Sequence, residues 1–183
     1  MAQEQSFIRP DVFWQDVGLK GEQVVVHLGC GAGFYLLPAA HIVGRRGKVI
    51  GVDILPDMLA EVESKAERDG VAHIVQTVRA NLENAPGSSV PQRAADWVLV
   101  ANILHQSDPT KILQEAKRVV AANGHVVVVE WDTAASPLGP PIEKRLPKSD
   151  ARRVVKELGF VVDREIQPSP YHYGLILSLG TTS

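Results

Sequence analysis

The feature that most constrains the fold is the alternation of short, β-branched apolar runs with amphipathic stretches. Five such runs predict buried strands, at residues 24–28, 48–53, 73–78, 97–101 and 125–131. Helical patterns occupy residues 34–43, 56–69, the stretch from Pro109 to a stop at Asn123-Gly124, and 149–158. Continuous apolar strands suit a parallel sheet covered on both faces, and the repeated strand–helix–strand order predicts a doubly wound α/β fold with right-handed crossovers.

The end of the chain follows a different pattern. Two more strands are expected at residues 160–167 and 171–179, separated only by Pro168-Ser169-Pro170. A link this short cannot form a parallel crossover, so the two segments should pair as an antiparallel hairpin. The expected architecture is therefore a mostly parallel, seven-stranded sheet with a C-terminal antiparallel hairpin.

Two segments look irregular. Residues 1–20 are expected to form an N-terminal cap, with an apolar patch at Phe13, Trp14 and Val17. Residues 132–147 are rich in proline and glycine and follow the fifth strand, at the carboxyl edge where open α/β sheets bind ligands. The 183 residues should form a single domain, 1–183, because this length leaves little room for a second core.

Composition argues against several kinds of partner. The net charge is −2 and long runs of Lys or Arg are missing, so nucleic acid is not an expected partner. The apolar runs fall far short of the ~20 residues needed to span a bilayer, and residues 1–10 do not look like a secretory leader. Cys30 is the single cysteine, and the six histidines lack metal-ligand spacing. The expectation is a cytoplasmic protein without a metal site.

The first predicted strand leads directly into Gly29-Cys30-Gly31-Ala32-Gly33. Glycines at such a turn let the backbone approach a ligand closely. The second predicted strand ends in Asp53, whose carboxylate can accept hydrogen bonds from both hydroxyls of a ribose. The glycine spacing differs from the dinucleotide pattern G-x-G-x-x-G, and a phosphate-binding G-x-x-x-x-G-K-[ST] loop is missing. The pair indicates a nucleoside site of another kind.

With these motifs the sequence resembles the class I S-adenosylmethionine-dependent methyltransferases. It looks closest to the small type 11 group related to the ubiquinone and menaquinone biosynthesis methyltransferases. The resemblance runs from about Phe13 to Leu179 and rests on several segments in order. These segments are the glycine motif 25–33, the acidic strand end 49–53, the adenine region 80–86, the fourth strand 96–105 and the helix 113–120 with Asn123-Gly124.

The resemblance implies a set of residues around S-adenosylmethionine, which would leave as S-adenosylhomocysteine. Gly29, Gly31 and Gly33 would lie against the methionine part, Asp53 would bind the ribose, and Asn81 the adenine amino group. The full implied set is His27, Gly29, Cys30, Gly31, Gly33, Asp53, Ile54, Met58, Asn81, Leu82, Ala101 and Asn102. One departure stands out, because His27 replaces the acid that the family usually has there and brings no countercharge for the cofactor ammonium.

Methyl transfer from a sulfonium needs alignment of the acceptor and sometimes removal of a proton. His105 follows the fourth strand and is the candidate general base, although it could instead pack at a helix start. Phe13, Trp131 and Asp132 are the candidates for the acceptor pocket. The sequence names neither the acceptor nor its reacting atom, and it leaves monomer and homodimer open.

Three functions compete. The leading hypothesis is an S-adenosylmethionine-dependent methyltransferase that acts on a small molecule. The second is a protein that binds S-adenosylmethionine without transferring its methyl group, which His27 and the aromatic content of 5% motivate. The third is an NAD(P)-dependent oxidoreductase on a similar sheet, for which the glycine spacing is wrong.

Overall fold

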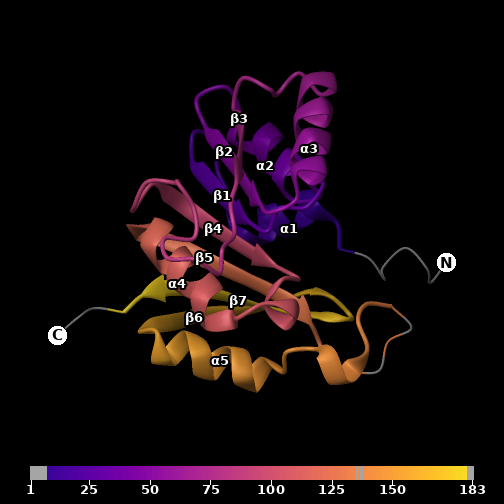
Figure 1. Ribbon diagram of the computed structural model, residues 1–183, viewed down its shortest axis with the longest axis vertical. Helices are drawn as coiled ribbons and strands as arrows, with labels where there is room; N and C mark the ends of the chain where they lie inside the picture. The colour runs from indigo at the N-terminus through magenta and orange to yellow at the C-terminus, as the bar shows by residue number, and fades with distance from the viewer. Residues whose placement is uncertain (1–7, 135, 137, 181–183) are drawn as a thin grey trace.

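A single mixed sheet organises the computed structural model, which describes residues 8–134, 136 and 138–180 (Figure 1). The strand order is β3-β2-β1-β4-β5-β7-β6. The strands are β1 (Val24–Leu28), β2 (Lys48–Asp53), β3 (Val75–Arg79), β4 (Ala95–Ala101), β5 (Val120–Trp131), β6 (Phe160–Ser169) and β7 (His172–Leu179). Strands β1 to β5 are parallel, whereas β7 runs antiparallel to both β5 and β6. The predicted doubly wound sheet with its C-terminal hairpin is confirmed.

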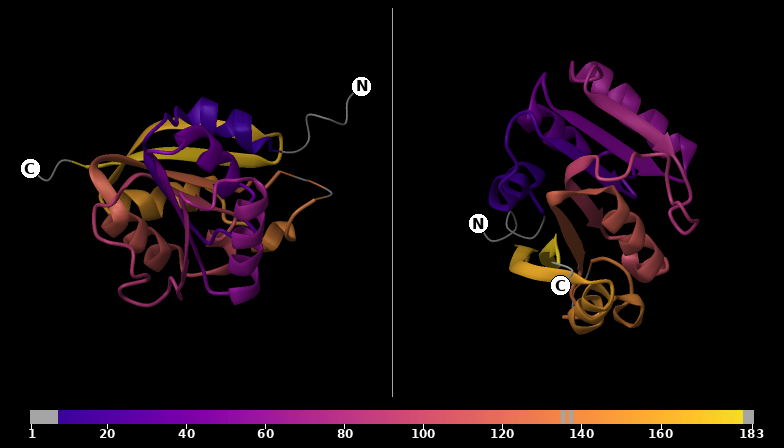
Figure 2. Two further views of the ribbon diagram at one scale, coloured as in Figure 1. Left: turned by 90° about the horizontal axis from the view of Figure 1, so that it is seen from above. Right: turned by 90° about the vertical axis from the view of Figure 1, so that its left-hand side faces the viewer.

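Helices cover both faces of the sheet (Figure 2). One face packs against α1 (Pro10–Val17), α2 (Leu36–Val43) and α3 (Pro56–Arg68), and the other against α4 (Pro109–Val119) and α5 (Lys148–Glu157). Successive strand residues point to opposite faces, so Val25 joins the first core and Val26 the second. None of the helices in the described ranges combines the length and apolar character needed to cross a bilayer.

The N-terminal segment is more regular than the sequence pattern predicts. Residues 10–17 form the helix α1 instead of an irregular stretch, so that expectation was wrong. Pro10 occupies the first turn, where its missing N–H breaks no helical bond, and Gly18 ends the helix with a φ of 97°. Trp14 is buried in α1, and its indole Nε1 donates to the carbonyl oxygen of Tyr35 at 2.8 Å. Residues 1–7 of the cap segment lie outside the described residues, as do Ala135 and Pro137 of the later loop.

The transition from α4 to β5 is the second difference. The helix ends at Val119, and β5 begins at Val120 instead of after Asn123-Gly124. The register passes from Ala95↔Val120 to Trp97↔His125, so extra residues bulge out of β5 opposite Asp96. A Cβ at Gly124 would lie 2.7 Å from the carbonyl oxygen of Ala95, so the bulge requires glycine there. The glycine indicates a close backbone contact within the sheet, not a helix stop.

Candidate functional site

The glycine loop lies at the carboxyl edge of the sheet, next to the switch point between β1 and β4. The amides of Gly29 and Cys30 both donate to the carbonyl oxygen of Val52, at 2.8 and 3.0 Å, which holds the loop against the end of β2. A Cβ at Gly29 would lie 2.4 Å from Cδ1 of Ile103, whereas one at Gly31 would meet nothing within 4 Å. Gly29 is therefore needed for packing inside the protein, and Gly31 leaves its outer side open to a ligand.

Asp53 connects the loop to the end of β2. Its Oδ2 accepts a hydrogen bond from the Gly31 amide at 2.9 Å, and its Oδ1 accepts one from the Leu55 amide at 3.0 Å. Each carboxylate oxygen can accept a second hydrogen bond. The carboxylate is thus fixed in place by the backbone and keeps capacity for two further donors.

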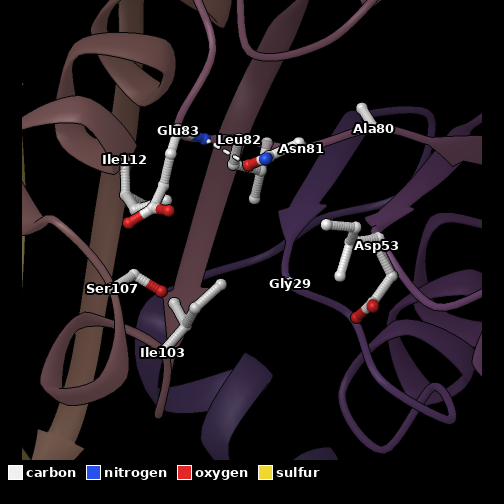
Figure 3. Close-up of a pocket in the computed structure, with 10 residues that line it drawn as sticks. Gly29, Asp53, Ala80, Asn81, Leu82, Glu83, Ile103, Ser107 and Ile112 are labelled. Atoms are coloured by element: carbon white, nitrogen blue, oxygen red, sulfur yellow. Dashed lines mark hydrogen bonds between the residues drawn. The ribbon is translucent and has the colours of Figure 1, made fainter.

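Asp53 opens onto a pocket, shown in Figure 3. Five residues from the predicted cofactor set line it: Gly29, Asp53, Ile54, Asn81 and Leu82. The pocket also has walls outside the predicted residue set, formed by Ala80, Glu83, Ile103, Ser107 and Ile112. In the figure, Asp53 lies across the pocket from Glu83 and Ser107. The structure therefore brings together residues at or just after the ends of four strands, β1 to β4, around one concave space.

Asn81 and Ile54 present different chemistry to this pocket. The Oδ1 atom of Asn81 accepts from the Glu83 amide at 3.0 Å, which fixes the side-chain orientation. Ile54 is 51% exposed, an unusual position for a large apolar side chain. A polar acceptor and an apolar surface in one pocket suit a flat, heteroaromatic ring with an amino group.

The other predicted cofactor residues lie outside the walls of this pocket. The Cys30 side chain is buried, and its Sγ would contact a Cβ built on Gly51, so it points into the interior. Burial and the Asp53 charge raise the pKa of the Cys30 thiol to about 12. Gly33 packs tightly against Leu37 and Val62, and Ala101 belongs to the core. Met58 is half-buried within α3.

His27 is the most unusual polar residue near the loop. It is 2% exposed, and neither ring nitrogen has a hydrogen-bond partner among the described residues. Burial lowers the pKa of its imidazole to about 3, so the ring is neutral at pH 7. The Tyr35 ring contacts it edge-on at 5.8 Å, and the Tyr35 hydroxyl likewise lacks a partner within the described part of the chain. Buried polar atoms without partners are rare, and each requires an explanation.

A second unusual polar group follows β4. Asn102 adopts a left-handed backbone with φ of 54°, a conformation that asparagine tolerates better than most residues. Its Nδ2 lies 3.5 Å from Nε2 of His172, while its buried Oδ1 has no partner in the ranges that the structure describes. His172 is held in turn by Ser169, whose Oγ lies 2.8 Å from Nδ1. The backbone strain at Asn102 orients a side chain that is only partly satisfied.

His105 lies in the short helix η1 (Leu104–Gln106), directly after Asn102 and Ile103. Its Nδ1 is 2.9 Å from Oε2 of Glu130, a wholly buried carboxylate near the end of β5. The other oxygen of Glu130, Oε1, accepts the Leu104 amide at 2.7 Å. The sequence reasoning missed Glu130, although a single acid after four consecutive valines was a visible signal.

Trp131 and the loop after β5 form the outer rim. The Trp131 ring lies 4.1 Å from the His172 ring, and a Cβ at Gly139 would come within 2.6 Å of the indole. Arg145, which is buried, holds the loop over this ring by donating to main-chain oxygens of Asp132, Ala134, Leu138 and Pro140. Its guanidinium carbon lies 5.5 Å from the Trp131 ring centre. Arg145 therefore ties together four positions of the loop, and the side chains of Asp132 and Ser136 add local hydrogen bonds.

The remaining acceptor candidates occupy different surroundings. Phe13 is buried in the core, with its ring 5.0 Å from that of Tyr35. Asp132 is half-buried at the rim, where its amide donates to the Tyr171 carbonyl oxygen at 2.8 Å. Phe13 therefore backs Tyr35 from the interior, whereas Trp131 and Asp132 lie at the carboxyl edge beside the loop.

Comparison with known families gives a direct match. The family described as "Methyltransferase domain" matches residues 19–162. A curated relative is the ubiquinone/menaquinone biosynthesis C-methyltransferase of Escherichia coli (strain K12 / DH10B), 29% identical over 128 residues. That match covers 69% of this chain and 49% of the relative, so the chain spans about half the length of the curated relatives it matches.

Solved structures share nearly the whole fold. A SAM-dependent methyltransferase from Aquifex aeolicus is 25% identical and has a TM-score of 0.85, with coverage of 97% of this chain and 93% of that one. A putative type 11 methyltransferase from Sulfolobus solfataricus is 29% identical with a TM-score of 0.78, covering 97% and 96%. The sheet described above is thus the Rossmann-like sheet of these proteins.

Proposed function

The chain belongs to the methyltransferase-domain family, whose members use S-adenosylmethionine, and we propose that it transfers the cofactor's methyl group to a small-molecule acceptor. The observation that carries this proposal is the Asp53 carboxylate. It is bound by the glycine loop, faces the pocket at the ends of β1 to β4, and keeps two acceptor positions free. Two ribose hydroxyls match those positions.

The pocket supports the adenosine half of the cofactor. Asn81 offers an oxygen for the adenine amino group, Ile54 an apolar surface for the ring, and Leu82 a backbone amide. These residues and Gly29 are the proposed adenosine-binding residues. Gly31, Gly33 and the Cys30 backbone would border the methionine chain, with Met58 and Ala101 further out.

The unpartnered buried atoms support the methionine half. His27 supplies an acceptor and a donor in its neutral form, Asn102 supplies the Oδ1 acceptor and Tyr35 a hydroxyl. A ligand that carries both an ammonium and a carboxylate offers complementary groups to this set. The absence of a countercharge at His27 predicts weaker cofactor binding than an acid would give.

The acceptor side would be bounded by the described part of the cap segment and by the loop after β5. Trp131 and Asp132 would contribute to its walls, with Phe13 supporting Tyr35 from behind. We propose a single domain acting as monomer or homodimer in the cytoplasm, with a small molecule rather than nucleic acid as its acceptor. The relative from Escherichia coli is named for ubiquinone and menaquinone biosynthesis, so precursors of quinones belong in the first set of acceptors to test.

Two measurements test this function. Calorimetry should show binding of S-adenosylmethionine and S-adenosylhomocysteine, and no binding of NAD(P)H. Transfer of tritium from methyl-labelled S-adenosylmethionine to a metabolite panel should then label a small molecule. Binding without label in any acceptor would favour a protein that binds the cofactor without transfer, and binding of NAD(P)H alone would refute the proposal.

A further inference from the structure

We infer that Glu130 is a positioning residue that fixes His105 in the tautomer of a general base, and that the acceptor reacts through a hydroxyl group. The inference rests on the proposed methyl transfer and adds the class of nucleophile to it. It depends on the three atoms that meet at the Glu130 carboxylate and on the free side of the His105 ring.

Glu130 is placed where a carboxylate is costly. It follows the apolar run Val126–Val129 in β5 and is 0% exposed. A buried charge persists only when good partners surround it. Both partners of Glu130 come from η1, because Oε1 accepts the Leu104 amide at 2.7 Å and Oε2 lies 2.9 Å from Nδ1 of His105. The carboxylate therefore orients this short helix together with its histidine.

The contact determines which ring nitrogen of His105 carries the proton. A carboxylate can only accept, so Nδ1 must be the donor, and in the neutral ring Nε2 keeps its lone pair. Nε2 makes no hydrogen bond within the described part of the chain, and the His105 side chain is 12% exposed. Ile103 and Ser107, each two residues from His105 along the chain, line the pocket beside Asp53. The short helix that carries His105 therefore borders the proposed cofactor pocket.

Other ionisable groups near Glu130 are poor substitutes for His105. Burial, together with the Glu130 charge, raises the pKa of the Tyr35 and Tyr173 hydroxyls above their usual range. The pKa of His172 is lowered to about 4 by burial and by Arg145, which makes its ring a weak base. His105, in contrast, has the Glu130 carboxylate at its Nδ1 and no hydrogen bond at its second ring nitrogen within the described ranges.

A base of this kind matters for some nucleophiles and not for others. A phenolic hydroxyl has a pKa of about 10, so it must lose its proton as it attacks. In the proposed step, the acceptor oxygen bonds to the methyl carbon and the methyl–sulfur bond breaks, leaving its electron pair on sulfur. The hydroxyl proton moves to Nε2 of His105, which later releases it to water. An aromatic thiol is largely ionised near neutral pH and needs no such base.

The positioning can be tested on the free protein. Nitrogen NMR of the imidazole should show His105 with its proton on Nδ1. In Glu130→Gln, the Leu104 amide still requires the side-chain oxygen, which turns the amide NH₂ toward Nδ1. His105 should then carry its proton on Nε2. The exposed pair of variants Glu67→Gln and His73→Gln provides matched controls and should leave the His105 spectrum unchanged.

The chemical role is tested with phenol and thiophenol as probe acceptors and methyl-labelled S-adenosylmethionine. Glu130→Gln and His105→Gln should each reduce transfer to phenol by at least about a hundredfold, the usual scale of general-base catalysis. Transfer to thiophenol should fall less than about threefold, because its proton is already lost. A purely structural role would reduce both rates together.

Several results would overturn the inference. The first is that the proton of His105 stays on Nδ1 in Glu130→Gln. The second is that the variants lose the same factor in the rate of transfer to phenol and to thiophenol. The third is that the wild-type protein binds S-adenosylmethionine but does not methylate phenol. Failure of the proposed function looks different, because calorimetry would then show no cofactor binding while the tautomer experiment remained informative.

Discussion

The two halves of the candidate site satisfy their polar groups in opposite ways. Beside Asp53, the carboxylate and the Asn81 amide are held by backbone amides and open onto a pocket. Around His27 and Asn102, buried polar atoms have no partner among the described residues. The polar groups of the first half have partners before a ligand binds, whereas we propose that a ligand supplies the partners in the second half. Substitutions should therefore act mainly on affinity in the first half and on both stability and affinity in the second.

The largest effect should come from Asp53→Asn. An amide offers one acceptor oxygen instead of two and carries no charge, so both charge-assisted bonds to a ribose weaken. We expect the Kd for S-adenosylhomocysteine to rise at least about a hundredfold, about 2.7 kcal/mol, measured by calorimetry. Asp57→Asn, an exposed change in the first turn of α3, is the control and should leave Kd unchanged. A rise below tenfold for Asp53→Asn would show that the pocket is not organised around this carboxylate.

The next prediction concerns how His27 makes the free energy of unfolding depend on pH. Its folded pKa of about 3 lies below the unfolded value of 6.5, so below pH 6.5 the unfolded chain binds a proton that the folded protein excludes. The free energy of unfolding should fall by about 1.4 kcal/mol per pH unit from this residue as pH drops from 6.5 toward 3. Urea unfolding measured between pH 6.5 and 5 should show that the free energy of unfolding of His27→Leu falls less steeply with decreasing pH than that of the wild type, by this amount per pH unit.

Exposed His73 supplies the comparison for this slope. His73→Gln should keep the wild-type pH dependence, because the side chain lies in solvent. His172, whose pKa is lowered to about 4, contributes to the slope in every variant and does not distinguish them. Identical slopes for His27→Leu and wild type would mean that His27 is hydrated or paired in the folded protein.

A smaller effect, a gain in affinity for S-adenosylmethionine, is expected when His27 is replaced by aspartate. Relative to His27→Asn, His27→Asp restores a negative charge for the ammonium of S-adenosylmethionine. Calorimetry at pH 7.5 should show affinity about tenfold higher for the Asp variant, the equivalent of one charge-assisted hydrogen bond. Equal affinities would indicate that the cofactor ammonium binds elsewhere.

The smallest effect should come from Asn81→Asp. Asparagine and aspartate both present an oxygen to an amino group, so the Kd for S-adenosylhomocysteine should change by less than about threefold. Asn81→Ala removes that oxygen and the contact to the Glu83 amide, and should weaken binding more. A large effect of the Asp variant would show that Asn81 uses its amide nitrogen as well.

The sequence predicted the sheet well because β-branched runs and glycine-terminated helices are local signals. The end of the second predicted strand placed Asp53 at the carboxyl edge, and the family resemblance added Asn81; both line the pocket. Sequence reasoning failed at α1, an eight-residue helix whose local signals, Pro10 and Gly18, were overlooked and whose apolar face packs against Tyr35 and its neighbours. It also failed at Gly124, whose reason is a close approach to β4.

The site residues that sequence reasoning missed depend on contacts between distant segments. Glu130 lies 25 residues from His105 and 26 from Leu104 along the chain, and only the pairing of β4 with β5 brings them together. Arg145 gave no signal, because its partners are backbone oxygens of a proline- and glycine-rich loop. Tyr35 likewise becomes notable only once His27 is seen beside it.

Arg145 has a consequence for how this protein can diversify. The guanidinium holds the loop after β5 through main-chain oxygens alone, and every residue type carries such an oxygen. Loop side chains that take no part in this support can thus be exchanged while the guanidinium contacts persist. We therefore expect the loop after β5 to be a suitable place for changing acceptor choice, by mutation over generations or by design, as long as Arg145 is kept together with Gly139, which packs against Trp131.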